Sequence, residues 1–455
     1  MEQDLLTAFS GAGAKRAVRI FRIHEGAVED APIPDGLKAL ARANGYSGEA
    51  GALLAGEEGV LYGVGDGSDA LIAAGAADKL PEGDYVFDGD FSAEDATLTA
   101  LAWLIGGYRF DHYKSLRPAG ARLIAPENAD IEAAAREADA VRLARDLINT
   151  PAGDMTPDGL EAAARSLAEK HGAAVSVTLG DDLLKQNFPM IHAVGRAATA
   201  APRLIDLRWG PEDAPKVTLV GKGVTFDCGG LNIKGAAGMA LMKKDMGGGA
   251  HTLALAQMIM SAGLNVRLRA LVPAVENAIA GNAFRPGDIL QSRKGLTVEI
   301  GNTDAEGRLI LGDALALGGE ENPDLMVSLA TLTGAARIAL GPELVPYYTD
   351  DEDLAGALAE AAARRADPLW RMPLWRNYDS MLSSQIADIN HISGGSFAGS
   401  VTAALFLRRF TPEDGRWVHF DLYGWRPKAA PGRAVGGEAQ AIRALYAVIA
   451  ARYGA

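Results

Sequence analysis

The feature that most constrains the fold is a series of short, strongly apolar stretches between residues 150 and 455, separated by segments with helical periodicity. The stretches are AVSVTL, RLIDLRW, KVTLVG, VRLRALV, LTVEI, LMVSLATL and WVHFDL. The helical segments between them include GAHTLALAQMIMSAG, LILGDALAL, AGSVTAALFLRRF and GEAQAIRALYAVIAARY. Strands this apolar must be covered on both faces, so we predict an α/β domain with a mixed, mainly parallel central sheet between helices. Ligands of such sheets bind beyond the carboxyl ends of the strands.

The length of the chain, 455 residues, exceeds what one ordinary hydrophobic core accommodates, so we expect two domains. Residues 1–125 alternate shorter strand and helix patterns, which predicts a smaller N-terminal α/β domain. The stretch ENADIEAAAREADAVRLARDLIN is typical of one long helix, which cannot continue through Pro151 and Pro157. We therefore interpret residues 126–149 as a linker helix and residues 150–455 as the larger C-terminal domain.

The charge balance and the cysteine content exclude several classes of protein. Acidic residues outnumber basic ones 58 to 44, so a general nucleic-acid partner is not expected. The single cysteine, Cys228, rules out an internal disulfide and fits a reducing compartment. We see no signal-peptide pattern and no apolar run of the ~20 residues that cross a bilayer. These observations predict a cytoplasmic protein without a membrane partner.

Charged residues cluster at two places where apolar strands end. In the first, the strand VTLVG runs directly into Lys222, and a glycine-rich segment follows that carries Asp227, Lys234 and Asp245. The second is GNTDAEGRL, which carries Asp304, Glu306 and Arg308. Four carboxylates can converge only if cations offset their repulsion, and divalent metal ions are the simplest candidates. None of the seven histidines shows the HExxH spacing, so we predict a carboxylate-based hydrolytic site, with room for two ions about 3.5–4 Å apart.

The residues alone leave simpler interpretations open. Asp245 could cap the helix that follows it, and Asp304 could form a structural ion pair with Arg308. Lys243 and Lys244 are interpreted as plain surface charges, and Met242 could be a core residue.

The two charged segments resemble one known family. NTDAEGRL is similar to the signature octapeptide of the leucyl aminopeptidase family, the M17 cytosol aminopeptidases, and VGKGVTFDCGG and LMKKDMGG resemble its companion segment. Further similar stretches are ARDLINTPAGDMTP, LATLTGAARIALG, DINHISGGSFAGSVTAALFLRRF and HFDLYGWRP. The resemblance covers roughly residues 140–455 and implies that residues 150–455 form a catalytic aminopeptidase domain. A domain of this kind would remove the N-terminal residue, leucine or another, mostly apolar residue, from short peptides.

The resemblance also implies roles for individual residues. Lys222, Asp227, Asp245 and Glu306 would bind a tightly held metal ion, and Asp227, Asp304 and Glu306 a more exchangeable one. Lys234 would polarise the scissile carbonyl, and Arg308 would hold a bicarbonate ion as general base. Met242, Thr331 and Gly334 would line the pocket for the first side chain, to which Leu332 adds its backbone.

The implied cofactors are two divalent ions per subunit, Mn²⁺ or Zn²⁺, together with bicarbonate. A water bound between the ions would attack near neutral pH. The implied assembly is a homohexamer.

Two alternative functions stay open: another carboxylate-liganded binuclear hydrolase, acting on phosphate esters or amides, and a moonlighting DNA-binding protein. The complete set of charged residues argues against an inactive enzyme.

Two minor features complete the sequence-based predictions. GVGDGS, residues 63–68, has the glycine density of a phosphate-binding loop but not its full spacing, so we interpret it as a turn. Cys228 is expected to be a buried small residue, and our hypothesis is that Cys228→Ser retains activity. Lost turnover at unchanged metal content would refute it.

Overall fold

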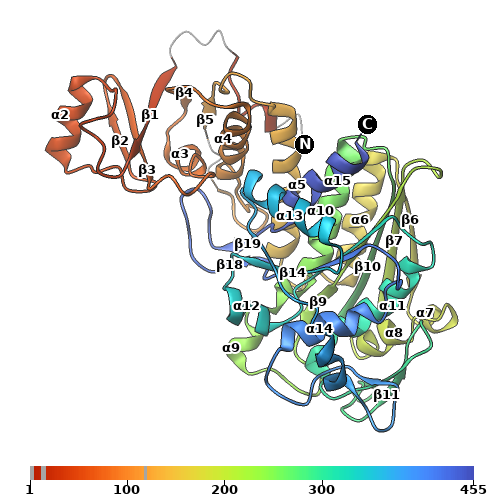
Figure 1. Ribbon diagram of the computed structural model, residues 1–455. Coiled ribbons are helices and arrows are strands. Elements are labelled where there is room, and N and C mark those ends of the chain that lie inside the picture. Colours follow the sequence, from red (N-terminus) through yellow and green to blue (C-terminus); the bar gives the residue numbers. More distant parts are fainter. Residues whose placement is uncertain (1–4, 12–16, 117–119, 455) are drawn as a thin grey trace. The chain divides into compact units, whose positions relative to one another are not determined.

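The computed structural model describes residues 5–11, 17–116 and 120–454 and divides the chain into two compact units (Figure 1). Unit 1 comprises Met1–Arg142, Arg364–Ala366 and Arg426–Val435, and unit 2 comprises the rest of the chain. The division falls within one long helix, α5 (Ile131–Asn149). In the described part of the chain, no helix is both long enough and apolar enough to span a membrane.

Unit 1 is built on a five-stranded sheet with the strand order β2-β3-β1-β4-β5. Strands β3, β1, β4 and β5 run parallel, and the edge strand β2 is antiparallel to β3. Its elements are β1 (Val18–His24), α2 (Asp35–Asn44), β2 (Leu53–Gly56), β3 (Gly59–Gly65), α3 (Ala74–Lys79), β4 (Gly83–Phe87), α4 (Ala93–Gly106) and β5 (Ala121–Leu123). The predicted smaller N-terminal α/β domain is confirmed.

Unit 2 contains a nine-stranded mixed sheet whose centre is parallel. The path is β15-β14-β17-β13-β8-β10-β7-β6, and β9 pairs with β10 beyond the end of β8. The strands are β6 (Ala174–Leu179), β7 (Arg203–Trp209), β8 (Lys216–Gly221), β9 (Gly223–Asp227), β10 (Arg267–Asn277), β13 (Leu325–Ala330), β14 (Val345–Tyr348), β15 (Leu369–Arg371) and β17 (Trp417–Asp421). Shorter strands are β11 (Ile289–Gln291), β12 (Thr297–Glu299), β16 (Ile389–Asn390), β18 (Trp425–Arg426) and β19 (Gly436–Gly437). The predicted mixed, mainly parallel sheet is confirmed.

Helices cover this sheet, as the apolar strands require (Figure 1). Helix α10 (Gly247–Ser261) packs against β8, β10 and β13 and against α6 (Pro157–His171) and α15 (Ile442–Tyr453). Helix α11 (Gly307–Gly319) packs against the same three strands and against α8 (Pro189–Gly195) and α14 (Gly399–Arg408). The remaining helical segments are α7 (Asp182–Lys185), α9 (Ala236–Met239), η1 (Met242–Met246), η2 (Thr303–Ala305), α12 (Gly334–Leu340), α13 (Glu352–Arg364) and η3 (Arg376–Leu382).

The helix boundaries differ from the sequence-based expectations at three places. The linker helix expected over residues 126–149 begins only at Ile131. We expected residues 437–453 to be helical, but α15 begins only at Ile442, after the short strand β19. Pro157, which we used only as a stop for the preceding helix, is also the first residue of α6. Proline suits this position because its missing N–H would have no partner there, and the Thr156 side chain caps the same helix by accepting from the Gly159 amide.

Asp313 in α11 is a buried carboxylate that joins this helix to neighbouring segments. It accepts hydrogen bonds from the backbone amides of Met190, Ile191 and Arg293 at 2.8, 3.3 and 2.8 Å. Burial raises the pKa of Asp313 to about 7. The carboxylate supplies partners for three donors that burial would otherwise leave unpaired.

We expect Asp313→Ala to lower the free energy of unfolding by about 3 kcal/mol or more, because each unpaired buried donor costs roughly 1–3 kcal/mol. Urea denaturation of the full-length protein measures the effect. Asp353→Ala, on the exposed side of α13, is the matched control and should change stability little. Equal stability of the two variants would contradict the assigned role.

Candidate metal centre

The predicted charged residues lie where the parallel strands of unit 2 end. Lys222 directly follows β8, and Asp227 is the last residue of β9. Asp245 belongs to the 3-10 helix η1, and Glu306 immediately precedes α11. The strand expected at LTVEI and the helix expected at LILGDALAL are both present, as β12 and α11, but β12 belongs to a separate three-stranded sheet with β11 and β16 and not to the central sheet. This edge is where ligands of parallel sheets bind.

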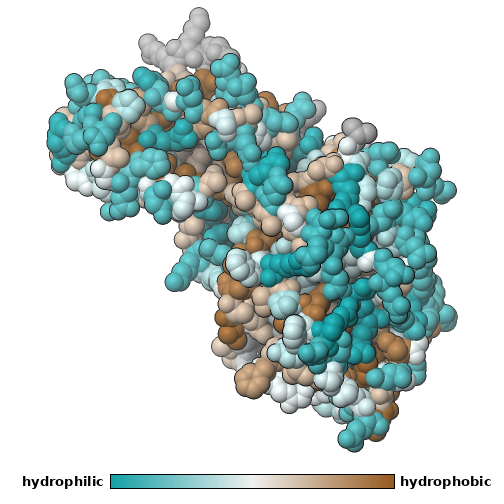
Figure 2. Space-filling model, viewed as in Figure 1, coloured by the Kyte–Doolittle hydropathy of each residue, from teal (hydrophilic) through white to brown (hydrophobic). Residues whose placement is uncertain are grey.

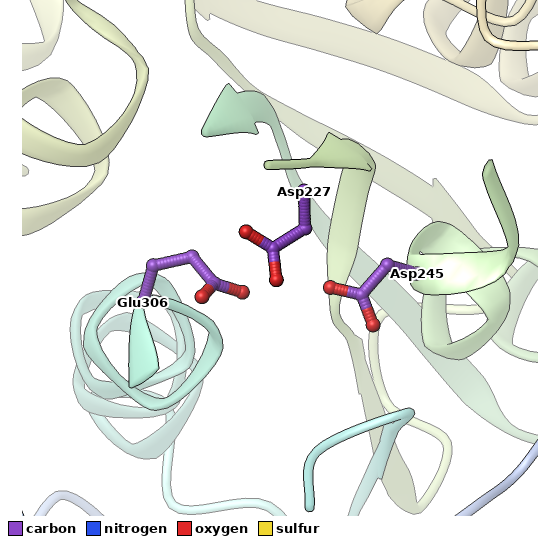
Figure 3. Close-up of side chains that lie close together, drawn as sticks. All are labelled: Asp227, Asp245 and Glu306. Atoms are coloured by element: carbon purple, nitrogen blue, oxygen red, sulfur yellow. The ribbon is translucent and has the colours of Figure 1, made fainter. Parts of the chain in front are cut away.

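Three buried carboxylates converge at this edge (Figure 3). Asp227, Asp245 and Glu306 are each at most 3% exposed, and they offer oxygens that all lie within 4.8 Å of one another. Burial, followed by the charges of Glu306 and Asp245, raises the pKa of Asp227 well above its ordinary value. Burial and the charge of Asp245 also raise the pKa of Glu306, although Lys222 opposes this. Burying three carboxylates this close together costs free energy unless cations neutralise their charge.

Lys222 is the most deeply placed cation of the cluster. Its Nζ lies 2.7 Å from Asp245 Oδ2 and 3.0 Å from Glu306 Oε1, and it donates to the Thr331 carbonyl oxygen at 3.1 Å. Burial lowers the pKa of Lys222, but the charges of Asp245, Glu306 and Asp227 outweigh burial and raise it overall. Without a metal ion, Lys222 is therefore an ammonium group that partly neutralises three carboxylates.

Lys234 links the fourth predicted carboxylate to the cluster. Its Nζ lies 2.8 Å from Asp227 Oδ2 and also contacts Asp304. The Lys234 side chain is 14% exposed and that of Asp304 31%, so this pair lies at the open side of the cluster. Asp304 is therefore connected to the cluster by its ion pair with Lys234, and it does not belong to the group of three carboxylates.

The carboxylate oxygens retain unused capacity to accept. Glu306 Oε2 has neither a hydrogen-bond donor nor a lysine contact among the described residues, whereas Glu306 Oε1 and Asp304 Oδ1 pair with the ammonium groups of Lys222 and Lys234. Unused buried oxygens in a close carboxylate group are suitable ligands for Mg²⁺, Mn²⁺ or Zn²⁺. The residues present therefore fit a divalent metal site.

Arg308 lies in the first turn of α11 and is buried. Its Nη1 donates to the His391 carbonyl oxygen at 2.7 Å, and its Nε has no hydrogen-bond partner among the described residues. Burial lowers the pKa of Arg308 to about 10, although Asp421 and Glu306 oppose this, so the side chain stays charged at neutral pH. It does not form the structural ion pair with Asp304 considered from the sequence, because among described residues Asp304 pairs with Lys234.

Of the residues expected to line a substrate pocket, Thr331 contacts the carboxylate cluster directly. Met242 is half-buried at the start of η1, and Gly334 is exposed at the start of α12. Thr331 is buried, and its hydroxyl donates to Asp245 Oδ1 at 2.9 Å. The Leu332 amide donates to Asp421 Oδ1 at 3.1 Å, which leaves its carbonyl oxygen as the backbone group available to a ligand.

The prediction that Lys244 is a surface charge is wrong. Lys244 is only 5% exposed, and its Nζ lies 4.8 Å from the centre of the Tyr423 ring. Burial lowers the pKa of Lys244 to about 8. Lys243, its neighbour, is half-buried and donates to the Asn149 carbonyl oxygen at 2.5 Å.

Cys228 is a free, half-buried thiol and is therefore less buried than expected. Burial raises the pKa of this thiol, so Cys228 is not an activated thiolate.

Two residues that support the cluster were not identified from the sequence. Asn277, opposite Asp227 in the β9–β10 register, donates to Asp227 Oδ1 at 2.8 Å. Asp421, opposite Ala330 in the β13–β17 register, accepts from the amides of Leu332 and Thr333. Both residues end parallel strands of the same sheet, and this shared position was the signal that could have identified them.

Comparisons with known proteins support the resemblance to the M17 cytosol aminopeptidases. Residues 142–446 match the catalytic domain of the cytosol aminopeptidase family, and residues 35–126 match the M17 aminopeptidase N-terminal domain. A probable cytosol aminopeptidase of Roseiflexus castenholzii is 40% identical over 365 residues, which cover 75% of this chain and 74% of the relative.

Two solved structures have the same fold. The crystal structure of the cytosol aminopeptidase from Coxiella burnetii matches with a TM-score of 0.92 and 42% identity, covering 98% of this chain and 100% of the other. The bottromycin maturation enzyme BotP, in complex with Mn, matches with a TM-score of 0.86 and 32% identity, covering 96% and 99%.

Proposed function

The chain belongs to the cytosol aminopeptidase family, whose members are metal-dependent hydrolases of N-terminal peptide bonds, and we propose that Lys222, Asp227, Asp245, Asp304 and Glu306 bind its two metal ions. The convergence of three buried carboxylates is the observation that carries this proposal. Lys222, Asp227, Asp245 and Glu306 hold the buried ion. Asp227, Glu306 and the more exposed Asp304 hold the second.

Bound divalent ions supply a water that is acidic enough to act as nucleophile near neutral pH, and they polarise the scissile carbonyl. The chain itself orients the ligands. Asn277 and the Gly229 amide, each 2.8 Å from Asp227 Oδ1, fix this carboxylate, whose Oδ2 pairs with Lys234. The Thr331 hydroxyl likewise fixes Asp245 through Oδ1, and Asp245 Oδ2 pairs with Lys222. Lys222 must lose its proton to bind, so an ion has to replace the charge that the ammonium group now supplies.

Lys234 and Arg308 act on the reacting groups. Lys234 is the more exposed lysine of the cluster, so its ammonium group faces the bound peptide and stabilises negative charge on the carbonyl oxygen. Arg308 holds a bicarbonate ion that serves as general base, because its Nε is an unused buried donor and a guanidinium matches a planar anion.

The first side chain of the substrate, leucine or another apolar residue, contacts Met242, Thr331 and Gly334, while the Leu332 carbonyl oxygen accepts from the substrate backbone. Methionine adapts its shape easily, so several apolar residues fit. The ions are Mn²⁺ or Zn²⁺, and the Mn complex of the similar BotP supports manganese.

Chelation is expected to lower the hydrolysis of leucine p-nitroanilide by about 100-fold or more, since the ions supply several kcal/mol of transition-state stabilisation. The midpoint of thermal unfolding should also fall, because metal binds only the folded cluster. Adding back Mn²⁺, Zn²⁺ or Mg²⁺ one at a time, with a panel of aminoacyl amides, identifies the active ion and the preferred residue. Undiminished activity of fully stripped protein would contradict the proposal.

We further propose that the protein forms a homohexamer. Large exposed apolar side chains lie in or shortly before α9, α12 and α14, and Figure 2 shows brown atoms at the surface over α9 and α12. They are Leu231, Ile233, Ile338 and Phe397, with Ile338 82% and Phe397 80% exposed. Exposed apolar surface can mark an interface between proteins. Sedimentation that gives only monomer would refute the assembly.

A further inference from the structure

Unit 1 contains a cavity that plays no part in the proposed hydrolysis. Its volume is about 410 Å³, which lies in the range of small-molecule sites. The cavity opens at the carboxyl ends of the parallel strands β1, β3 and β4 and reaches the first turns of α4 (Figure 1). Parallel sheets bind their ligands at this end.

Two basic side chains of β1, Arg22 and His24, line the cavity, and each rests against a glycine turn. Gly67 follows β3 with φ +81°, and a Cβ placed there would lie 2.8 Å from the His24 ring. Gly89 follows β4 with φ +101°, and a Cβ there would lie 3.7 Å from Arg22 Nη2. Gly67 belongs to the glycine-rich segment GVGDGS, which we interpreted as a turn; residues 63–65 are instead the end of β3, and the chain turns after them. The turn therefore also makes room for a basic side chain at the cavity.

The guanidinium of Arg22 has hydrogen-bond donors without a partner among the described residues. Its guanidinium lies over the Phe91 ring at 4.0 Å, but it forms no hydrogen bond or ion pair with any residue that the structure describes. The carboxylates around the cavity differ in this respect. Asp88 pairs with Arg19 and Asp69 pairs with Arg433, whereas Asp95 accepts from the Ser92 hydroxyl at 2.8 Å and keeps its charge, which acts on Arg22. Arg22 is exposed and is, among the described residues, the one arginine or lysine that lines the cavity, so its guanidinium can reach a ligand there.

The walls of the cavity are apolar and partly aromatic. Tyr62, Phe87 and Leu98 are all buried side chains that line it. The Tyr62 hydroxyl is occupied, since it donates to the Ile72 carbonyl oxygen at 2.6 Å, so Tyr62 offers its ring. A flat apolar group can lie against these rings while an anionic group reaches Arg22 in two-pronged fashion.

We propose that this cavity binds a small organic anion, a carboxylate or a phosphate ester, whose body is a flat apolar ring. The anionic group pairs with Arg22, and the ring lies against Tyr62, Phe87 and Leu98. This site lies wholly within unit 1 and does not depend on the proposed function of unit 2.

Calorimetric titration of the full-length, metal-loaded protein with phenyl phosphate, phenylacetate and uncharged benzyl alcohol tests the proposal. At least one of the two anions should bind, and benzyl alcohol should bind at least about tenfold more weakly. Whichever anion binds more tightly identifies the preferred group. Equal binding of benzyl alcohol, or no binding of either anion, would overturn the proposal.

Three variants separate this cavity from the metal centre, which can also bind anions. Arg22→Gln removes the charge, and Ala70→Trp fills the cavity from an exposed position. Each should weaken binding of the preferred anion about tenfold or more. Arg42→Gln is the matched control, because Arg42 pairs with Glu29 and lies outside the cavity lining. Binding that survives both Arg22→Gln and Ala70→Trp belongs elsewhere and refutes the site. Circular dichroism spectra and thermal unfolding like those of the wild type show that the variants fold.

Discussion

Glu306→Gln is expected to lower kcat/KM for leucine p-nitroanilide by about 1,000-fold or more, equivalent to roughly 4 kcal/mol of transition-state stabilisation. Glutamine keeps the shape of the side chain but lacks the charge that makes both Glu306 oxygens ligands. Glu306 is only 1% exposed, so bulk water cannot substitute for the lost carboxylate. Metal content, measured by elemental analysis after dialysis, should fall together with activity.

Unfolding is not the expected cause of this loss. Asp227, Asp245 and Glu306 repel one another in the metal-free protein, so removing one of the three charges relieves repulsion. The metal-free variant should therefore unfold at the same temperature as the metal-free wild type, or above it. Glu320→Gln, at the exposed end of the same helix, is the matched control and should keep full activity. A Glu306→Gln enzyme with native metal content and native rate would remove the basis for a two-metal site.

The sequence was sufficient to predict the layers of the fold, because its strands in unit 2 are apolar almost throughout. VTLVG and LMVSLA cannot face water on either side, which requires helices on both faces. It was also sufficient to predict that charged residues gather at one end of the sheet, since Lys222 directly follows the apolar strand β8.

Burial of an individual polar residue could not be predicted in the same way. Lys243 and Lys244 are adjacent and chemically identical, yet Lys244 is buried against Tyr423. Tyr423 lies almost 180 positions away in the sequence, so nothing local distinguishes the two lysines. Asp421 was missed for the same reason, because its partners Leu332 and Thr333 become neighbours only through the pairing of β13 with β17.

The two lysines of the metal centre are expected to have separable roles, because their surroundings differ. The Lys222 side chain is 4% exposed and contacts Asp245 and Glu306, which are both buried. Lys234 is 14% exposed and contacts Asp227 and the more exposed Asp304. Lys222→Met should therefore lose bound metal, whereas Lys234→Met should retain it.

For Lys234→Met we expect kcat to fall by about 100- to 1,000-fold with little change in KM, because an ammonium group that faces the carbonyl oxygen acts mainly when negative charge develops there. Steady-state kinetics with leucine p-nitroanilide, on protein of verified metal content, measures both constants. Lys185→Met, whose lysine pairs with Asp182 on the surface, is the control and should behave as wild type. If Lys234→Met instead lost its metal and kept its kcat once the metal was restored, Lys234 would only balance the charge of Asp227 and Asp304. The stabilisation of the developing oxyanion would then have to come from the ions alone.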